Sequence, residues 1–94
     1  MDIELNIIER RGVVSARENG EIVGDLVFKI RDNGDIVITH THVSDGYEGR
    51  GIGRTLVQHA AEYAMQRNVK IIPLCSFARS YIERNEKLRM LLAD

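Results

Sequence analysis

Val43-Ser44-Asp45-Gly46-Tyr47-Glu48-Gly49-Arg50-Gly51-Ile52-Gly53 is the stretch that decides the fold, because its four glycines join a strand to a helix. Gly49, Gly51 and Gly53 allow main-chain N–H groups to approach a ligand without interference from a Cβ atom. The first turn of the following helix adds N–H groups that have no partner within the helix. Together with the helix dipole, these groups predict a binding site for a phosphate or pyrophosphate.

Four β-like segments precede this loop, at residues 3–9, 13–17, 22–31 and 36–43. They show alternation of apolar and polar residues or are rich in β-branched side chains, as strands are. Asn19-Gly20 and Asn33-Gly34 separate the last three segments, and such pairs favour tight hairpin turns because they tolerate positive φ. We therefore predict four consecutive strands in an antiparallel meander.

From Gly51 the period of the apolar residues becomes helical, which places six of them on one side of a helix: Ile52, Leu56, Val57, Ala60, Ala64 and Met65. Asn68 can take the left-handed conformation that ends such a helix, and residues 69–74 then have the composition of a buried strand. Crossovers of this type are right-handed and join parallel strands. The segment therefore predicts a β-α-β unit.

Ser76 can cap a last helix, in which Phe77, Tyr81 and Leu88 contribute to an apolar side and Asn85-Glu86 can form a break. The predicted fold class is α+β (mixed α/β): a four-strand antiparallel meander, a β-α-β crossover and a C-terminal helix. Ninety-four residues suffice for one domain and are too few for two. We expect residues 1–94 to form a single domain.

The composition makes several classes of partner improbable. The chain has 13 Lys and Arg residues and 14 Asp and Glu residues, which gives a net charge of −1. This charge provides no overall positive potential that would attract nucleic acid or an anionic membrane. The start of the chain has no basic, apolar leader, and no stretch approaches the roughly 20 apolar residues of a membrane span. We expect a cytoplasmic protein. Its one cysteine forms no internal disulfide, and no Cys/His cluster predicts a metal site.

The glycine loop does not fit two common nucleotide-binding motifs. A P-loop ends in Gly-Lys-Ser/Thr, whereas Arg54-Thr55 follows Gly53, and a dinucleotide fingerprint follows the first strand of its β-α-β unit. Glu48-Gly49-Arg50-Gly51-Ile52-Gly53 instead resembles the coenzyme A loop of the GNAT superfamily of acetyltransferases, Gln/Arg-x-x-Gly-x-Gly/Ala. Both glycines match, and Glu48 replaces the usual first residue.

The resemblance to this superfamily extends over nearly the whole chain, because the predicted order of strands and helices is that of its core. The superfamily's usual pair of helices after the first strand has no room here, so the chain is similar to its very small, single-domain members. His40-Thr41 and the segment Pro73-Leu74-Cys75-Ser76-Phe77-Ala78 agree with that subgroup.

The resemblance implies that acetyl-coenzyme A is a co-substrate whose pantetheine arm enters between the fourth and fifth strands. Val43 to Tyr47 would offer main-chain partners to pantetheine, and the loop and helix start would hold the pyrophosphate. The implied cofactor-binding residues are Val43, Glu48, Gly49, Arg50, Gly51, Ile52, Gly53 and Arg54. The Glu48 carboxylate cannot help a phosphate, so backbone amides and Arg50 or Arg54 must do so, unless these arginines simply face water.

His40 and Cys75 are the candidate residues for the chemistry of acetyl transfer. His40 and His42 are two apart on a strand and are expected to share a face with Ile36 and Ile38, where either imidazole could serve as base. His40 is the stronger candidate because it belongs to the subgroup's His-Thr pair, while His42 fits better as a hydrogen-bonded core or surface residue. A two-histidine metal site lacks a third ligand.

Cys75 is the candidate nucleophile, because it precedes a helix N-terminus at which a thiolate is favoured. The alternative is a small buried apolar residue. Tyr81 does not fit as the tyrosine acid of larger relatives, because aligning Cys75 with their usual Asn puts Ile82 at the tyrosine position.

The sequence thus predicts an acetyl-coenzyme A-dependent N-acetyltransferase that acts on a small-molecule or peptide amine, as a monomer or homodimer. Two alternatives remain open: a non-catalytic acyl-coenzyme A binding or sensing module, and a small interaction domain. Transfer could be direct or could pass through Cys75, with His40 as base.

Overall fold

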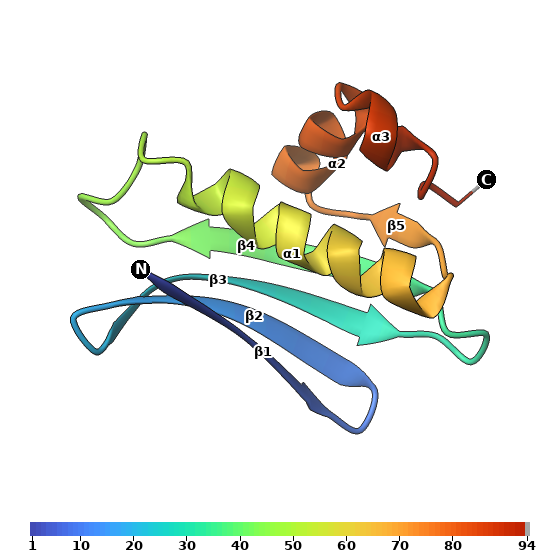
Figure 1. Ribbon diagram of the computed structural model, residues 1–94, viewed down its shortest axis with the longest axis horizontal. Helices are drawn as coiled ribbons and strands as arrows, with labels where there is room; N and C mark the ends of the chain where they lie inside the picture. The colour runs from blue at the N-terminus through green and yellow to red at the C-terminus, as the bar shows by residue number, and fades with distance from the viewer. Residues whose placement is uncertain (94) are drawn as a thin grey trace.

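Five strands form one sheet in which spatial order equals chain order (Figure 1). The structure is a computed structural model that describes residues 1–93. The first four strands pair antiparallel, and β4 and β5 pair parallel, so both the predicted meander and the predicted crossover are confirmed. The strands are β1 (Asp2–Ile8), β2 (Arg11–Glu18), β3 (Glu21–Ile30), β4 (Ile36–Val43) and β5 (Ile71–Pro73).

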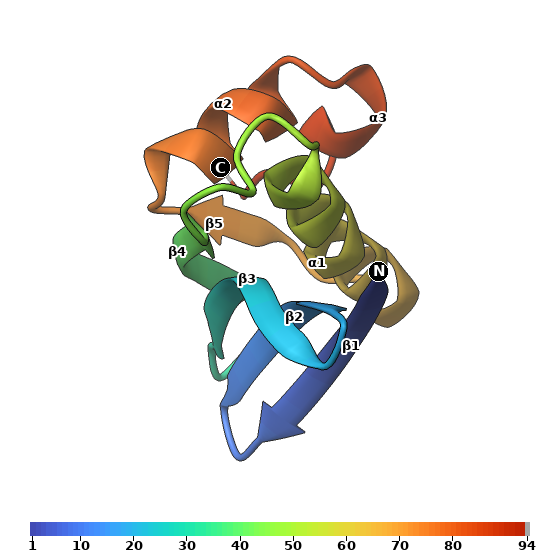
Figure 2. The ribbon, with the colours of Figure 1, turned by 90° about the vertical axis from the view of Figure 1, so that its left-hand side faces the viewer.

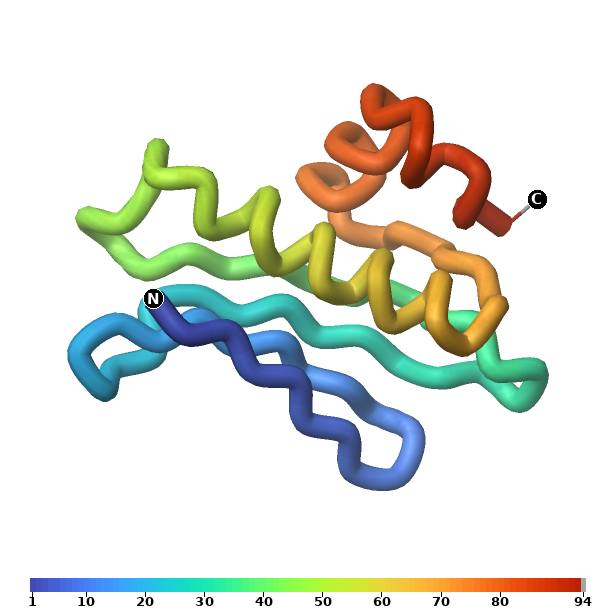
Figure 3. The backbone as a smooth tube through the Cα atoms, in the orientation of Figure 1, coloured from blue at the N-terminus to red at the C-terminus, as the bar shows by residue number. Residues whose placement is uncertain are grey.

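The helix α1 (Ile52–Arg67) carries the chain from β4 back to β5 and packs on β2, β3 and β4, with the twisted sheet curving around it (Figure 2). Beyond β5 follow α2 (Ser76–Glu83) and the short α3 (Glu86–Arg89), as the backbone trace shows (Figure 3). Within residues 1–93, no helix has the length and apolar character that crossing a membrane requires. The helices α1 and α2 contact the sheet and each other, and α3 contacts α2.

The turns and helix ends follow the chemistry of their residues. Asn19 and Gly20 both have positive φ, 53° and 83°, as the first hairpin turn requires. Asn68 ends α1 at φ 57° and ψ 46°, and its N–H reaches the last carbonyls of the helix. The side chain of Asn85 accepts from the N–H groups of Lys87 and Leu88, which begins α3 at the predicted break.

A β-bulge in β4 changes which residues face the helices. Val27 pairs with His40 and Phe28 pairs with Ile38, so Thr39 is an extra residue without a partner on β3. Its hydroxyl instead donates to the carbonyl of Val27, with Oγ1 at 3.2 Å from the oxygen. In a regular strand, side chains would go on alternating between the two faces of the sheet through this point. The extra residue shifts this alternation by one, so the side chains after Thr39 face the side opposite to the one expected.

The expectation that His40 and His42 share a face with Ile36 and Ile38 is therefore wrong. Ile38 is opposite the core residue Phe28 and is fully buried, whereas both histidines are exposed. His42 is opposite Asp25, on the face of the sheet that points away from α1. Beyond the bulge it is Thr41, opposite the buried Leu26, that turns toward the helices.

One core joins the sheet, α1 and the C-terminal helices, with Ile52, Leu56, Val57, Ala60 and Ala64 contributed by α1 as predicted. Three apolar residues expected inside are not buried: Met65 is 48% exposed, Leu74 62% and Phe77 44%. Met65 lies at the edge of the apolar stripe, where Ala61 is buried instead. Ser76 is the first residue of α2 and provides no side-chain cap, which corrects its predicted role.

Two strand glycines let large groups approach the sheet closely. A Cβ atom on Gly12 would lie 2.2 Å from the tip of the Phe28 ring, which covers this position. On β3, a Cβ atom on Gly24 would lie 2.9 Å from Ile52 and 3.4 Å from Leu56. The close approach of Ile52 and Leu56 to Gly24 fixes the start of α1 over the end of β4, and hence the position of the glycine loop.

Gly12→Ala is expected to destabilise the fold by about 1–3 kcal/mol, because the added methyl overpacks a buried ring. In a Phe28→Leu background the same substitution is expected to cost clearly less, since the smaller side chain leaves room for the methyl. Urea unfolding of the four proteins measures both costs. An equal cost of Gly12→Ala in the two backgrounds would contradict the proposed contact.

Candidate functional site

A cleft of about 560 Å³ opens where the glycine loop meets β4 and the two helices α1 and α2. Most of the predicted cofactor-binding residues line it, and two residues that the sequence did not assign join them, Thr41 and Phe77. The lining residues are Thr41, Val43, Tyr47, Glu48, Gly49, Gly51, Ile52, Gly53, Arg54 and Phe77. Phe77 has partial exposure because it forms a wall of this cleft and packs against Gly53, not because α2 lacks an apolar side.

Gly49, Gly51 and Gly53 of the loop line the cleft, so its backbone is not covered by side chains there. Gly49 and Gly51 have φ of 78° and 80°, a left-handed conformation that favours glycine. Gly51 caps α1 without any side-chain hydrogen bond, and the first turn of α1 contains no acidic residue. The positive end of the helix is therefore available to an anion from outside.

The charged side chains of the loop have different roles. Arg50 donates through Nη2 to both carboxylate oxygens of Glu18, at 3.0 and 2.9 Å, and its guanidinium lies 5.1 Å from the centre of the Tyr47 ring. Glu48 accepts from the N–H of Gly46 at 2.9 Å, so it stabilises the turn. Arg50 thus ties the loop to the β2–β3 hairpin, and Arg54 is the arginine that lines the cleft.

Cys75 lies at the N-terminus of α2, beside the inward-facing Thr41. The thiol and the Thr41 hydroxyl are hydrogen-bonded, with Sγ at 3.6 Å from Oγ1. Burial raises the pKa of the Cys75 thiol, but hydrogen bonds from the backbone N–H of Ala78, the Thr41 hydroxyl and the backbone N–H of Phe77 outweigh it, and the net pKa is lowered. Because Thr41 also lines the cleft, a thiolate is favoured at the cleft's edge.

His40 lies on the opposite face, away from Cys75. Its Nε2 is 3.8 Å from Oδ1 of Asp25, and both side chains are partly exposed. Among residues 1–93, no hydrogen bond joins His40 to the thiol; the partner of the thiol is Thr41. Asp25 was missed by the sequence reasoning, although an acid in the middle of the apolar strand β3 was a signal that could have identified it.

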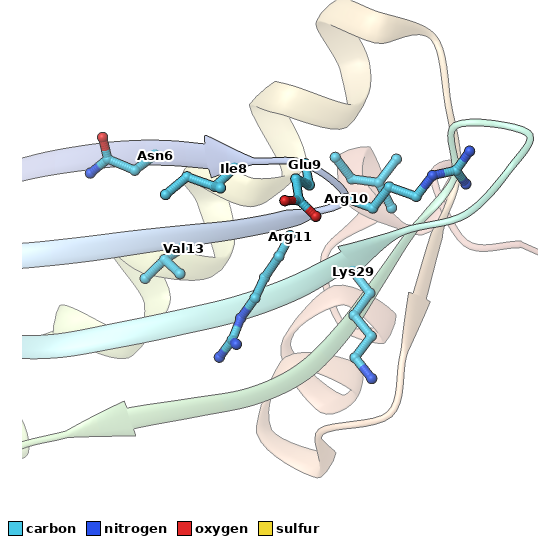
Figure 4. Close-up of a pocket in the computed structure, with 8 residues that line it drawn as sticks. Asn6, Ile8, Glu9, Arg10, Arg11, Val13 and Lys29 are labelled. Carbon is cyan, nitrogen blue, oxygen red and sulfur yellow. The ribbon is translucent and has the colours of Figure 1, made fainter.

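A second, larger hollow of about 700 Å³ lies at the β1–β2 turn, far along the sheet from the glycine loop. Asn6, Ile8, Arg11, Val13 and Lys29 line it from three strands, and the side chains of Arg11 and Lys29 extend from neighbouring strands (Figure 4). This hollow contains neither the glycine backbone nor Cys75. Its larger volume is therefore no reason to prefer it as the reaction site.

The sequence profile of the GCN5-related N-acetyl-transferase family matches residues 13–91. The chain therefore belongs to this family of acetyltransferases, and the resemblance read from the sequence is confirmed. The predicted fold class is confirmed as well, since the solved structures that resemble the chain include acetyltransferases of this fold.

Relatives of known sequence or structure match different lengths of the chain. A GCN5-like protein from Staphylococcus aureus, solved by NMR, is 31% identical, with TM-score 0.70, over 96% of this chain and 87% of that one. Protein NATD1 of Homo sapiens is 31% identical over 48 residues, 51% of this chain and 42% of NATD1, so the match spans less than half of that relative. A Bacillus anthracis protein solved in complex with acetyl-coenzyme A has TM-score 0.61 at 24% identity, over 70% of this chain and 38% of that one.

Thr41→Val is expected to raise the pKa of the Cys75 thiol toward its ordinary value, because it removes one of the hydrogen bonds that favour the thiolate. The thiolate is the reactive form, so alkylation by iodoacetamide should begin at higher pH and be slower below pH about 8. The rate of alkylation against pH measures this shift. Thr41→Ser, which keeps the hydroxyl, is the matched control and should keep the wild-type profile, and coincident profiles for wild type and Thr41→Val would contradict the assignment.

Proposed function

We propose that this domain binds acetyl-coenzyme A in the cleft and transfers the acetyl group to a primary amine of a small molecule or peptide. The observation that carries the proposal is that the cleft is bordered at the glycine loop by an uncapped helix N-terminus and at Thr41 by the residue to which the Cys75 thiol is hydrogen-bonded. The pyrophosphate would be bound by backbone N–H groups of Gly49 to Gly53 and by Arg54. The pantetheine arm would lie along Val43 and Thr41, so that its thioester ends near Cys75.

In the transfer that we propose, the Cys75 thiolate attacks the thioester carbonyl carbon and the coenzyme A thiolate leaves. N–H groups at the start of α2, which already favour negative charge on sulfur, also suit the developing oxyanion. An uncharged amine then attacks the carbonyl carbon of acetyl-Cys75, the carbon–sulfur bond breaks, and Cys75 leaves as thiolate while the nitrogen loses one proton to solvent to give the amide. In direct transfer the amine would attack the thioester itself.

His40 was expected to act as the base, but its place on the sheet gives it no direct part in this scheme. Because α2 already favours the thiolate, activation of Cys75 does not require the imidazole. His40 lies on the face of the sheet that carries Asp25, away from the thiol, so it is out of reach of an amine that attacks acetyl-Cys75. The separation of His40 from Cys75 also favours a second candidate function, acyl-coenzyme A binding without catalysis.

Arg54→Gln is expected to weaken the binding of coenzyme A by about tenfold at low ionic strength, because a charge-assisted contact to phosphate is lost. The loss should shrink at high salt, since the side chain is exposed and its field is screened. Calorimetric titration measures both. Arg67→Gln, which removes the same charge at the other end of α1, is the control. Unchanged affinity in Arg54→Gln would place the phosphates elsewhere, and no binding to wild type would overturn the proposed function.

Mass spectrometry of the protein mixed with acetyl-coenzyme A, without an acceptor, is expected to find one acetyl group on Cys75. The chain has only one cysteine, so a thioester-linked acetyl reports on this residue alone. Cys75→Ala should bind coenzyme A as wild type does and should lose turnover. If Cys75→Ala still acetylates an amine, transfer is direct; if wild type acetylates none in a broad amine panel while it binds coenzyme A, the binding module is favoured.

A further inference from the structure

A small polar hollow adjoins the cleft on the other side of the start of α1. It has a volume of about 260 Å³ and is lined by Arg50, Gly51, Arg54, Thr55, Gln58 and Tyr81. Gly51 and Arg54 line both this hollow and the cleft, so the two are continuous around the helix N-terminus. The hollow combines two guanidinium groups with a hydroxyl, an amide and a phenol, and no carboxylate lines it.

The hydrogen bonds within the hollow leave donors free for a ligand. Gln58 donates through Nε2 to the phenol oxygen of Tyr81 at 2.9 Å, so the Tyr81 O–H is free to donate elsewhere. Arg50 meets Glu18 through Nη2 alone, which leaves its other N–H groups. Arg54 has no salt bridge to any carboxylate in the part of the chain that the structure describes. Glu18 compensates the charge of Arg50, whereas the charge of Arg54 has no carboxylate partner among the described residues and converges with the free donors of Arg50 and Tyr81.

We propose that this hollow binds the 3′-phosphate on the ribose of coenzyme A, an inference that rests on the proposed function. The thioester end of the cofactor is assigned to Thr41 and Cys75, and the pyrophosphate to the glycine loop. The remaining end must therefore leave the cleft past Gly51 and Arg54, and that path leads into the hollow. A phosphomonoester with close to two negative charges matches the unpaired guanidinium of Arg54, the remaining N–H groups of Arg50 and a phenol better than an uncharged ribose hydroxyl does.

The inference gives the protein a specificity that neither the loop nor Cys75 provides. Coenzyme A and 3′-dephospho-coenzyme A are identical in pantetheine, pyrophosphate and adenine, and differ only in this phosphate. The glycine loop cannot distinguish them. Discrimination between the two would therefore come from the hollow, and we name its determinants as Arg54, Gln58 and Tyr81.

The test is calorimetric titration of the same protein with coenzyme A and with 3′-dephospho-coenzyme A. Wild type is expected to bind coenzyme A about tenfold more tightly, the size of a charge-assisted contact at a partly exposed site. Gln58→Glu should reduce this ratio to near one, because the new carboxylate pairs with Arg54 and repels the phosphate. Its affinity for 3′-dephospho-coenzyme A should fall less than its affinity for coenzyme A, because that ligand lacks the phosphate that the new carboxylate repels and loses only the contact of Arg54 to the pyrophosphate.

Gln66→Glu is the matched control, since it makes the same charge change on an exposed position two turns further along α1. It should leave the ratio at its wild-type value. Equal wild-type affinities for the two ligands would overturn the inference and leave the proposed function standing. A ratio that Gln66→Glu lowers as much as Gln58→Glu does would show a net-charge effect and would also overturn it. Absence of binding of either ligand would overturn the proposed function itself.

Discussion

The extra residue Thr39 in β4 is the constraint on which the site depends. Because it has no partner on β3, the strand changes face at this point, and Thr41 and Val43 turn toward the helices. Without the bulge, two histidines would line the cleft and Thr41 would point away from Cys75. The one unpaired residue thus divides β4 into two parts: the residues before it contribute side chains to the core, and the residues after it contribute side chains to the candidate site.

A second constraint is the close approach of α1 to the sheet at Gly24. Ile52 and Leu56 lie directly over this glycine, which leaves no room for a side chain there. The helix start is thereby held over the end of β4, and the loop between them has little freedom to move. The uncapped N–H groups of α1 and the inward face of β4 then border the same cleft. Core packing and ligand geometry are consequences of the same contact.

Much of the fold could be predicted because local chemistry determines it. Asn19-Gly20, Asn68 and Asn85 each take the conformation that their side chains favour, and the glycine loop has the positive φ values that glycine allows. The bulge could not be predicted, because Thr39 carries no signal that it lacks a partner. For this reason the predicted side of the sheet for His40 was wrong.

The candidate site was predicted in its backbone and less well in its side chains. The glycines were sufficient to locate the cleft, whereas the pairing of Arg50 with Glu18 joins residues 32 apart in sequence. Phe77 was assigned to the core because an apolar residue that lines a ligand cleft has the same sequence signature as one that is buried. Such distinctions depend on tertiary contacts.

The ion pair between Glu18 and Arg50 has a consequence for the thermodynamics of ligand recognition. Gly46, Gly49 and Gly51 give the unfolded chain many conformations, and the pair helps to restrict the loop to one of them when the protein folds. The entropy of ordering is then lost during folding and not at the moment of association. A preorganised loop of this kind exchanges some conformational stability for affinity, and the β2–β3 hairpin becomes part of the ligand site without touching the ligand.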